Sequence, residues 1–236
     1  MKDLCGVFGI YSKEKKNISQ IIYYGLYALQ HRGQDSAGMA INNNGYIDYH
    51  KGLGLAYEVL DKDVLNRLRG DIGIGHVRSG SSGETTTANS EPLVVGYKQG
   101  ALALAYDGNL VNYKELREKM EDDGIIFQSS IDTEVIANLI ARYHKEDIEQ
   151  AIIKAVKDIK GSYALVLMTN DRLIGIRDPY GLKPLCIGKL GKDYILSSET
   201  CALDTIGANF VRDVEPGEMV VIIDGDIKSI RTKESK

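Results

Sequence analysis

The chain lacks the cysteine and histidine patterns that build disulfide frameworks and metal sites. Its three cysteines, Cys5, Cys186 and Cys201, are widely spaced and include no CxxC pair. An odd, scattered set of this kind argues against a disulfide framework and against a zinc site. The four histidines show no HExxH or other metal-ligand spacing. We therefore expect neither a metal nor a cofactor.

Long apolar runs and an excess of basic residues are also missing. No stretch approaches the roughly 18 apolar residues that a membrane-spanning helix requires. The N-terminal sequence MKDLCGVFGIY has too short an apolar stretch for a signal peptide. A net charge of −4 provides no basic field for nucleic acid. The sequence thus predicts a cytoplasmic protein that binds neither membranes nor nucleic acid.

What the sequence does contain is the composition of one soluble globular domain. It has 236 residues, of which 43% are hydrophobic and 26% charged, enough to bury a sizeable core. No repeat, low-complexity segment or Pro/Ser-rich linker divides it. We expect one domain, and a homo-oligomer is compatible with this composition.

The order of the expected elements favours an α+β fold. A strand at 5–11 is followed by a helix with Asn17 or Ser19 as N-cap and by a hairpin around Asn43-Asn44-Gly45. Buried strands are expected at 72–78 and 101–105. Three helices are expected at 113–122, 133–144 and 147–160, and Gly161 suits the left-handed position after the last of them. Further strands are expected at 163–168, 173–177, 185–188, 194–197 and 219–223. Because strands precede a helical middle and resume after it, mixed sheets with helices packed outside them are favoured over βαβ alternation.

Several motifs follow one another along the chain. They are CGVFGIY from Cys5, HRGQDSAG from His31, GHVRSGSSG from Gly75, RDPYGLKPL from Arg177, SSETCALD from Ser197 and VRDVEPGE from Val211. Together they resemble the class II glutamine amidotransferases, which are N-terminal-nucleophile hydrolases, and within that group the amidophosphoribosyltransferase family. The resemblance covers essentially the whole chain. It implies a four-layer αββα sandwich of the N-terminal-nucleophile hydrolase type.

The resemblance also implies a division of the chain. Residues 1–4 are expected to be a propeptide, residues 5–230 a glutamine amidotransferase type 2 domain, and residues 231–236 a linker stub. An amidophosphoribosyltransferase also needs a phosphoribosyltransferase domain, in which an acidic pair runs into a Thr/Gly-rich loop after a strand. No such loop occurs in these residues, so that domain is expected to be a partner missing from this chain.

Cys5 is the expected nucleophile. By its position alone it is a buried strand cysteine, but the resemblance makes it the residue that attacks glutamine. A free α-amine titrates at about pKa 7.7–8.0 and can act as the base for its own thiol. The amine of Cys5 is held in a peptide bond while residues 1–4 remain, so this mechanism requires their removal.

Four further residues are expected to bind substrate. The resemblance assigns Arg78 to the α-carboxylate of glutamine, where a planar guanidinium gives bidentate recognition, and Asp132 to the α-amino group. Taken alone, Arg78 reads as a solvated cap at a strand end and Asp132 as a helix N-cap. Ser81 offers a hydroxyl in a Ser/Gly loop that is otherwise a plain surface loop. Arg32 either orders the site beside Cys5 or pairs with Asp35.

The segment Tyr106–Asn109 departs from the family. The family pattern is close to HNGNL, in which an asparagine amide and the next glycine N–H form the oxyanion hole. Here Gly108 keeps the backbone donor, while Asp107 replaces the amide and accepts hydrogen bonds without donating any. Losing one such donor costs about 10²–10³ in kcat, and a bare carboxylate about 4 Å away adds roughly 4 kcal/mol of repulsion at an effective dielectric of about 20. Either Asp107 is protonated, or the Asn109 amide supplies the missing oxyanion donor, or hydrolysis is impaired.

Three functions follow. The leading one is hydrolysis of glutamine to glutamate and ammonia through a Cys5 thioester, as the ammonia-supplying half of an amidophosphoribosyltransferase in purine biosynthesis. The second is a catalytically impaired glutamine-binding or regulatory module. It is favoured by Asp107 and by Ser79, which stands where the family often has an aromatic residue. The third is a stand-alone hydrolase of another small amide.

Overall fold

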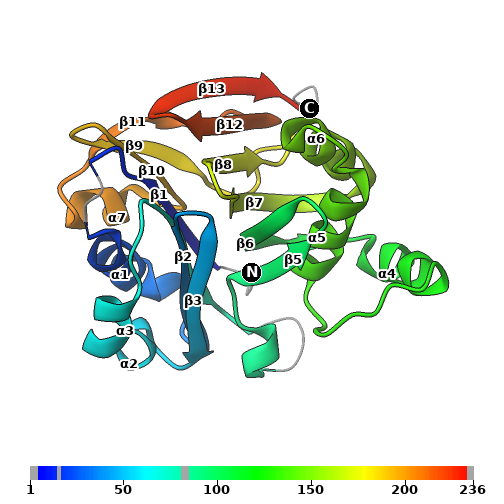
Figure 1. Cartoon of the computed structure of the whole chain (residues 1–236), viewed down its shortest axis with the longest axis horizontal. Coiled ribbons are helices and arrows are strands. Elements are labelled where there is room, and N and C mark those ends of the chain that lie inside the picture. Colours follow the sequence, from blue (N-terminus) through cyan, green and yellow to red (C-terminus); the bar gives the residue numbers. More distant parts are fainter. Residues whose placement is uncertain (1–4, 15–16, 81–84, 233–236) are drawn as a thin grey trace.

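The computed structural model describes residues 5–14, 17–80 and 85–232. It contains two antiparallel sheets that face each other (Figure 1). The seven-stranded sheet consists, in spatial order, of β11 (Asn209–Asp213), β9 (Cys186–Leu190), β10 (Asp193–Ser197), β1 (Gly6–Tyr11), β4 (Ile72–Arg78), β2 (Ser36–Asn43) and β3 (Tyr46–Leu53). The six-stranded sheet consists of β13 (Asp226–Arg231), β12 (Glu218–Ile223), β8 (Arg172–Arg177), β7 (Gly161–Met168), β6 (Gly100–Leu110) and β5 (Leu93–Tyr97).

Helices cover the outer face of each sheet (Figure 1). The seven-stranded sheet is covered by α1 (Ile18–Ala28), α2 (Ala56–Val59), α3 (Lys62–Arg67) and α7 (Thr200–Thr205), and the six-stranded sheet by α4 (Tyr113–Asp122), α5 (Asp132–Tyr143) and α6 (Ile148–Asp158). No helix in the described ranges is long and apolar enough to cross a membrane. The expected four-layer αββα arrangement is therefore the one observed.

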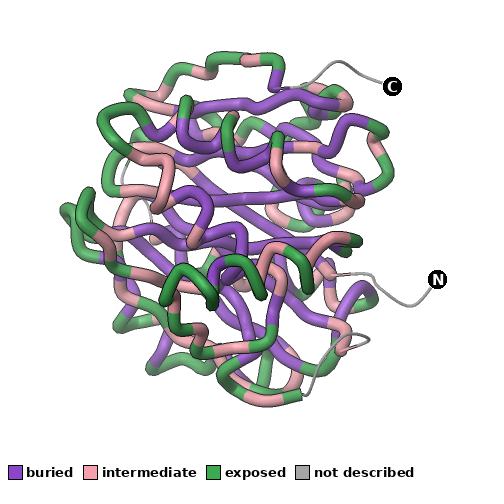
Figure 2. Tube along the Cα trace, turned by 90° about the vertical axis from the view of Figure 1, so that its right-hand side faces the viewer, coloured by how far each residue is buried: buried purple, intermediate pink, exposed green. Residues whose placement is uncertain are grey.

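Strand alternation divides the core into three clusters. In β1, Phe8 and Ile10 pack against the helices, while Val7 faces the other sheet. In β7, Leu165 belongs to the core under α5 and α6, and Val166 to the core between the sheets. Since both faces of the central strands are covered, these strands are mainly apolar and largely buried. Figure 2 shows the long buried segments that run through the interior in purple.

Several sequence expectations need correction. The strand expected at 101–105 continues to Leu110, because residues up to Leu110 pair with β7. Gly161 has the expected positive φ of 137°, but it begins β7 and does not cap the preceding helix, which ends at Asp158. Strands β5, β11 and β13 and the helices α2, α3 and α7 were not expected from the sequence.

The end of the described chain lies within the sheet. Arg231 is the last residue of β13, and the backbone N–H and hydroxyl of Thr232 both donate to the Gly217 carbonyl. The ordered structure thus extends through the first two residues of the expected linker stub. The rest of that segment and the expected propeptide, residues 1–4, lie outside the described residues.

Candidate active site

The predicted site residues come together because strand ends from both sheets meet. In the seven-stranded sheet β1 and β4 are antiparallel, with Gly6 opposite Val77, so Cys5 lies beside the end of β4 at Arg78. The end of β6 approaches from the other sheet. A cavity of about 660 Å³ opens here, and its lining includes Cys5, Arg78, Gly108, Asn109 and Asp132. Residues separated by more than 120 positions in the sequence thus share one cavity.

Asp132 does not act as a helix N-cap. It is the first residue of α5, Ile131 occupies the cap position, and the Asp132 side chain accepts from the Leu110 N–H at 2.8 Å and the Tyr106 hydroxyl at 3.4 Å. Burial raises the pKa of Asp132, and the Leu110 hydrogen bond opposes the shift. The carboxylate is half-buried in the cavity wall. The two hydrogen bonds fix its orientation.

Gly108 occupies a position that no other residue fits. A Cβ atom there would lie 2.3 Å from the carbonyl oxygen of Ser162 on the neighbouring strand. Gly108 therefore brings bare backbone to the cavity wall. Asn109, the next residue, lines the same cavity and is exposed.

Asp107 points away from the cavity. Along β6, Ala103 and Ala105 face the space between the sheets, and Asp107 follows the same alternation. The side chain is fully buried and is not among the described residues that line the cavity. Its Oδ1 accepts from the backbone N–H of Cys5 at 3.1 Å. Asp107 thus contacts Cys5, the predicted nucleophile, through the backbone nitrogen of Cys5.

Two cations balance the charge of Asp107. The Arg32 guanidinium lies 2.9 Å from its Oδ2, and the ammonium of Lys183 lies 3.0 Å from its Oδ1. Arg32 is itself buried and donates from Nε to the Cys5 carbonyl at 2.8 Å. The repulsion expected from a bare carboxylate is therefore largely offset.

Arg32 orders the backbone of Cys5. It follows α1 in a 3₁₀ turn, and its remaining nitrogen donates to Glu199. The alternative pairing with Asp35 is not what the structure shows, since Asp35 accepts from the Gly80 N–H instead. Among the described residues that line the cavity, Arg32 is absent. Its contacts are those of a positioning residue, and the prediction that it binds substrate has no support in this geometry.

Lys183 is a site residue that sequence analysis missed. In the sequence, the RDPYGLKPL segment supports only the family resemblance. In the structure, Asp178 fixes its turn by accepting from the N–H groups of Tyr180, Leu182 and Lys183 at 2.9, 3.2 and 3.1 Å. That turn aims the Lys183 side chain at Asp107. A lysine and an aspartate 76 positions apart carry no local signal that would link them.

Burial makes the Cys5 thiol a poor acid. Its pKa is raised to about 12, mainly by desolvation and further by the negative charges of Asp107 and Glu91, while a Ser79 backbone hydrogen bond and the charge of Arg78 oppose the shift. At neutral pH the thiol stays protonated. A nucleophilic Cys5 therefore needs a base close to its sulfur.

Two buried titratable groups in the cavity were also missed. Burial raises the pKa of Glu91 to about 7, even though it accepts from Thr133 and from the Tyr106 N–H at 2.8 Å. Burial lowers the pKa of His76 to about 4, so its ring is neutral and its Nε2 lies 2.9 Å from the Tyr106 carbonyl. Glu91 lies in none of the quoted motifs, and His76 lies in GHVRSGSSG, where the resemblance assigns no role to the histidine.

The loop after Arg78 is described only in part. Ser79 lines the cavity. Ser81, the expected hydroxyl ligand of the substrate, lies outside the described residues, so its role stays a prediction.

The fold and this arrangement define a class of protein. The model of the glutamine amidotransferase domain matches residues 76–205, and the chain belongs to that family. The predicted four-layer sandwich of the N-terminal-nucleophile hydrolase type is confirmed, since the glutamine phosphoribosylpyrophosphate amidotransferase of B. subtilis, solved with ADP and GMP, matches at a TM-score of 0.91 and 44% identity over 97% of this chain and 49% of that chain. A glutamine aminotransferase class-II domain protein from Silicibacter pomeroyi, 12% identical, shares the fold alone, with a TM-score of 0.65 over 96% of this chain and 99% of its own.

The curated relatives that the chain matches belong to one group within this class. The amidophosphoribosyltransferase of Methanocaldococcus jannaschii is 48% identical over 228 residues, which are 96% of this chain and 48% of that protein. The predicted resemblance to amidophosphoribosyltransferases is confirmed. The chain spans about half the length of the curated relatives that it matches.

Proposed function

We propose that this chain hydrolyses glutamine to glutamate and ammonia through a thioester on Cys5, after residues 1–4 have been removed. The observation that carries the proposal is the single cavity shared by Cys5, Arg78, Gly108 and Asp132. A guanidinium and a carboxylate in one cavity match the α-carboxylate and α-amino groups of a free amino acid. The cavity also holds a thiol and a backbone segment suited to an oxyanion.

The chemistry follows from the state of Cys5. The freed α-amine takes the thiol proton, the sulfur attacks the side-chain carbonyl carbon of glutamine, and the C–N bond breaks as the amine returns a proton to the departing ammonia. Water then cleaves the thioester to give glutamate. A base within the same residue is what a thiol with a pKa of about 12 requires.

Asp107 has a different role from the amide that it replaces. Its Oδ1 already accepts from the Cys5 nitrogen, so it positions the α-amine once residues 1–4 have left. Gly108 N–H remains as an oxyanion donor, and the exposed Asn109 amide is the second donor available in the cavity. With one donor lost and the carboxylate charge balanced, we expect reduced but retained hydrolysis.

The larger assembly is also a proposal. The described part of the chain from Cys5 to Thr232 acts as a glutamine amidotransferase type 2 domain, and a phosphoribosyltransferase domain uses the ammonia for purine biosynthesis. The relatives, which are about twice as long and are amidophosphoribosyltransferases, support this assignment.

A second function is favoured by Asp107 itself. A chain that keeps Arg78 and Asp132 but lacks the oxyanion amide would bind glutamine without efficient turnover. A third, hydrolysis of another small amide, is favoured by Ser79, a small residue in the lining of the cavity.

One assay separates the three functions. Glutamate or acid release is measured on the processed chain with glutamine and a panel of small amides, alongside a Cys5→Ala control and labelling of Cys5 by a glutamine-mimicking electrophile. Release from glutamine above the control supports the glutaminase. Labelling or saturable glutamine binding without release indicates the impaired module, and release from a different amide indicates the third function.

A further inference from the structure

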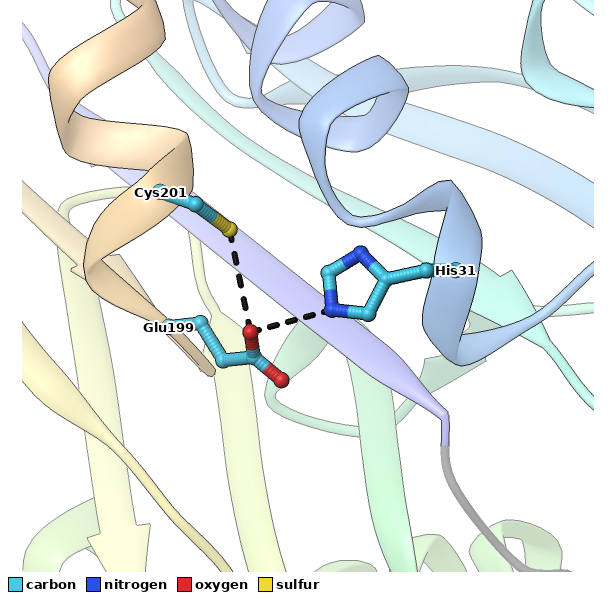
Figure 3. Close-up of side chains that lie close together, drawn as sticks. All are labelled: His31, Glu199 and Cys201. Carbon is cyan, nitrogen blue, oxygen red and sulfur yellow. Dashed lines mark hydrogen bonds and ion pairs between the residues drawn. The ribbon is translucent and has the colours of Figure 1, made fainter.

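A cluster of metal-binding side chains lies outside the cavity. His31 follows α1, Glu199 precedes α7 and Cys201 lies in its first turn; their side chains converge in Figure 3. One ligand atom from each residue lies within 4.8 Å of the others. We propose that His31, Glu199 and Cys201 form a binding site for a divalent transition metal of the Zn²⁺ type.

The hydrogen bonding of His31 carries this inference. Its Nδ1 lies 3.1 Å from the Ala28 carbonyl oxygen, which can only accept, so Nδ1 bears the hydrogen. In the neutral ring Nε2 then presents a lone pair, and it faces the Glu199 Oε2 at 3.0 Å. Two acceptors at this distance require a proton or a metal cation between them. Metal-bound histidines characteristically donate their second nitrogen to such a carbonyl.

The separations match a tetrahedral zinc centre. With Zn–N, Zn–O and Zn–S bonds of about 2.0, 2.1 and 2.3 Å, neighbouring N and O ligands lie about 3.3 Å apart and O and S ligands about 3.6 Å apart. The observed values are 3.0 Å for Nε2–Oε2 and 3.7 Å for Cys201 Sγ–Oε2. The ligand atom of His31 lies within 4.8 Å of Cys201 Sγ. Because the His31 side chain is 55% exposed, a small rotation of its ring can shorten the distance from Nε2 to Sγ.

The surroundings hold the carboxylate and leave room for water. Arg32 binds the other oxygen, Oε1, of Glu199 and so fixes Oε2 toward His31 and Cys201. Imidazole, thiolate and carboxylate together suit Zn²⁺ and not Mg²⁺ or Ca²⁺, which prefer oxygen ligands. Binding replaces the S–H bond of Cys201 by a metal–sulfur bond and releases the proton to solvent. Three protein ligands on an exposed surface leave a fourth position for water.

The test is a Co²⁺ titration of the full chain carrying Cys5→Ser, which removes the other accessible thiol. We expect a thiolate-to-cobalt charge-transfer band that saturates at one equivalent and disappears when Zn²⁺ is added. Cys201→Ser should abolish the band, and His31→Gln, at an exposed position, should weaken binding by about tenfold or more. The matched control His50→Gln, outside the cluster, should leave the titration unchanged.

Two results would overturn the proposal. A band that persists in Cys201→Ser would place the metal elsewhere, and no saturable band in the parent chain would leave His31 and Glu199 as an ordinary ion pair. Thermal unfolding of each variant checks that it is folded. The readout does not require glutamine hydrolysis, so it stands apart from the proposed function.

Discussion

Two buried carboxylates act on Cys5, and the structure satisfies them in opposite ways. Asp107 is paired with two cations, Arg32 and Lys183, and lies behind the nucleophile. Glu91 lines the cavity and is held by neutral donors, the Thr133 hydroxyl and the Tyr106 N–H. Both raise the pKa of the Cys5 thiol.

The difference shows that the partners of a buried carboxylate decide what it can do. Surrounded by cations, Asp107 serves as a fixed anion that holds the Cys5 nitrogen. Glu91 accepts its hydrogen bonds from neutral groups, and burial raises its pKa to about 7 although the charges of Lys51 and Arg78 oppose the shift. The site therefore combines an ion-paired carboxylate with a carboxylate that changes charge near neutrality, and four predictions test this contrast.

The largest expected effect comes from breaking the charge cluster. Arg32→Met leaves Asp107 with one cation and the Cys5 carbonyl without its donor, and removing one partner of a buried pair costs about 3–5 kcal/mol. Urea unfolding should show a loss of this size. The control Arg67→Met breaks the solvent-exposed pair with Asp48 and should cost less than about 1 kcal/mol. Equal losses in the free energy of unfolding would mean that the buried cluster stabilises the protein no more than an exposed ion pair does.

The titratable carboxylate should make stability depend on pH. Folded Glu91 keeps its proton up to about pH 7, whereas its ordinary value is 4.5. Between these values Glu91 binds more protons in the folded state than in the unfolded state, whereas His76, with its pKa lowered to about 4, binds fewer. The contribution of Glu91 alone is therefore a fall in stability as pH rises, of roughly 3 kcal/mol at about 1.4 kcal/mol per unit, which the contribution of His76 offsets.

The variant Glu91→Gln should remove that fall. Urea unfolding at several values between pH 4.5 and 8 compares it with the parent and with Glu115→Gln, which changes an exposed carboxylate. Parallel pH profiles for the parent and the Glu91 variant would contradict the assigned titration.

Substitutions of Arg78, which lines the cavity, should change the KM for glutamine more than they change the stability of the fold. Arg78→Ala is expected to raise KM for glutamine by about 100-fold, because hydrogen bonds to a charged group contribute about 1.5–3 kcal/mol. Arg78→Lys keeps the charge but not the planar fork, and should raise KM by about tenfold. An unchanged KM in steady-state assays would refute the assignment to the α-carboxylate.

The smallest expected effect is a gain. Asp107→Asn keeps an oxygen that can accept from the Cys5 N–H and adds an amide that can donate once it turns towards the cavity, so kcat should rise by about tenfold. It also leaves Lys183 without its anion, so stability should fall, and the double variant Asp107→Asn with Lys183→Met should recover part of that loss. No gain in kcat in either variant would show that the amide is not the missing element.

Local signals in the sequence account for much of the fold. The Asn44-Gly45 turn has φ of 52° and 89°, as the hairpin prediction requires. The strand 72–78 and the helix 113–122 have the predicted bounds. These elements were predictable because turn chemistry and apolar periodicity agree with the fold. Asn112 does occupy the position before the helix, but its side chain bonds to Asp158 and Lys160 and does not cap α4.

The missed features depend on contacts that no local pattern encodes. β6 continues through Asp107, Gly108 and Asn109, poor strand formers, because β7 supplies partners for them. The charge cluster joins Arg32, Asp107 and Lys183 from three distant segments. His31 meets Glu199 and Cys201 only through the packing of α1 against α7. Motif resemblance identified the cavity residues, whereas the cations behind Cys5 required the fold.

The central claim is that Cys5 acts with its own α-amine as the base, and one measurement tests it most directly. Glutamate release is compared for two preparations whose N-termini are established by mass spectrometry, one beginning at Cys5 and one retaining Met1. Since a positioned general base contributes about 10²–10⁴-fold, we predict that the chain beginning at Cys5 is at least about 100-fold faster. Equal rates in the two preparations would contradict the account.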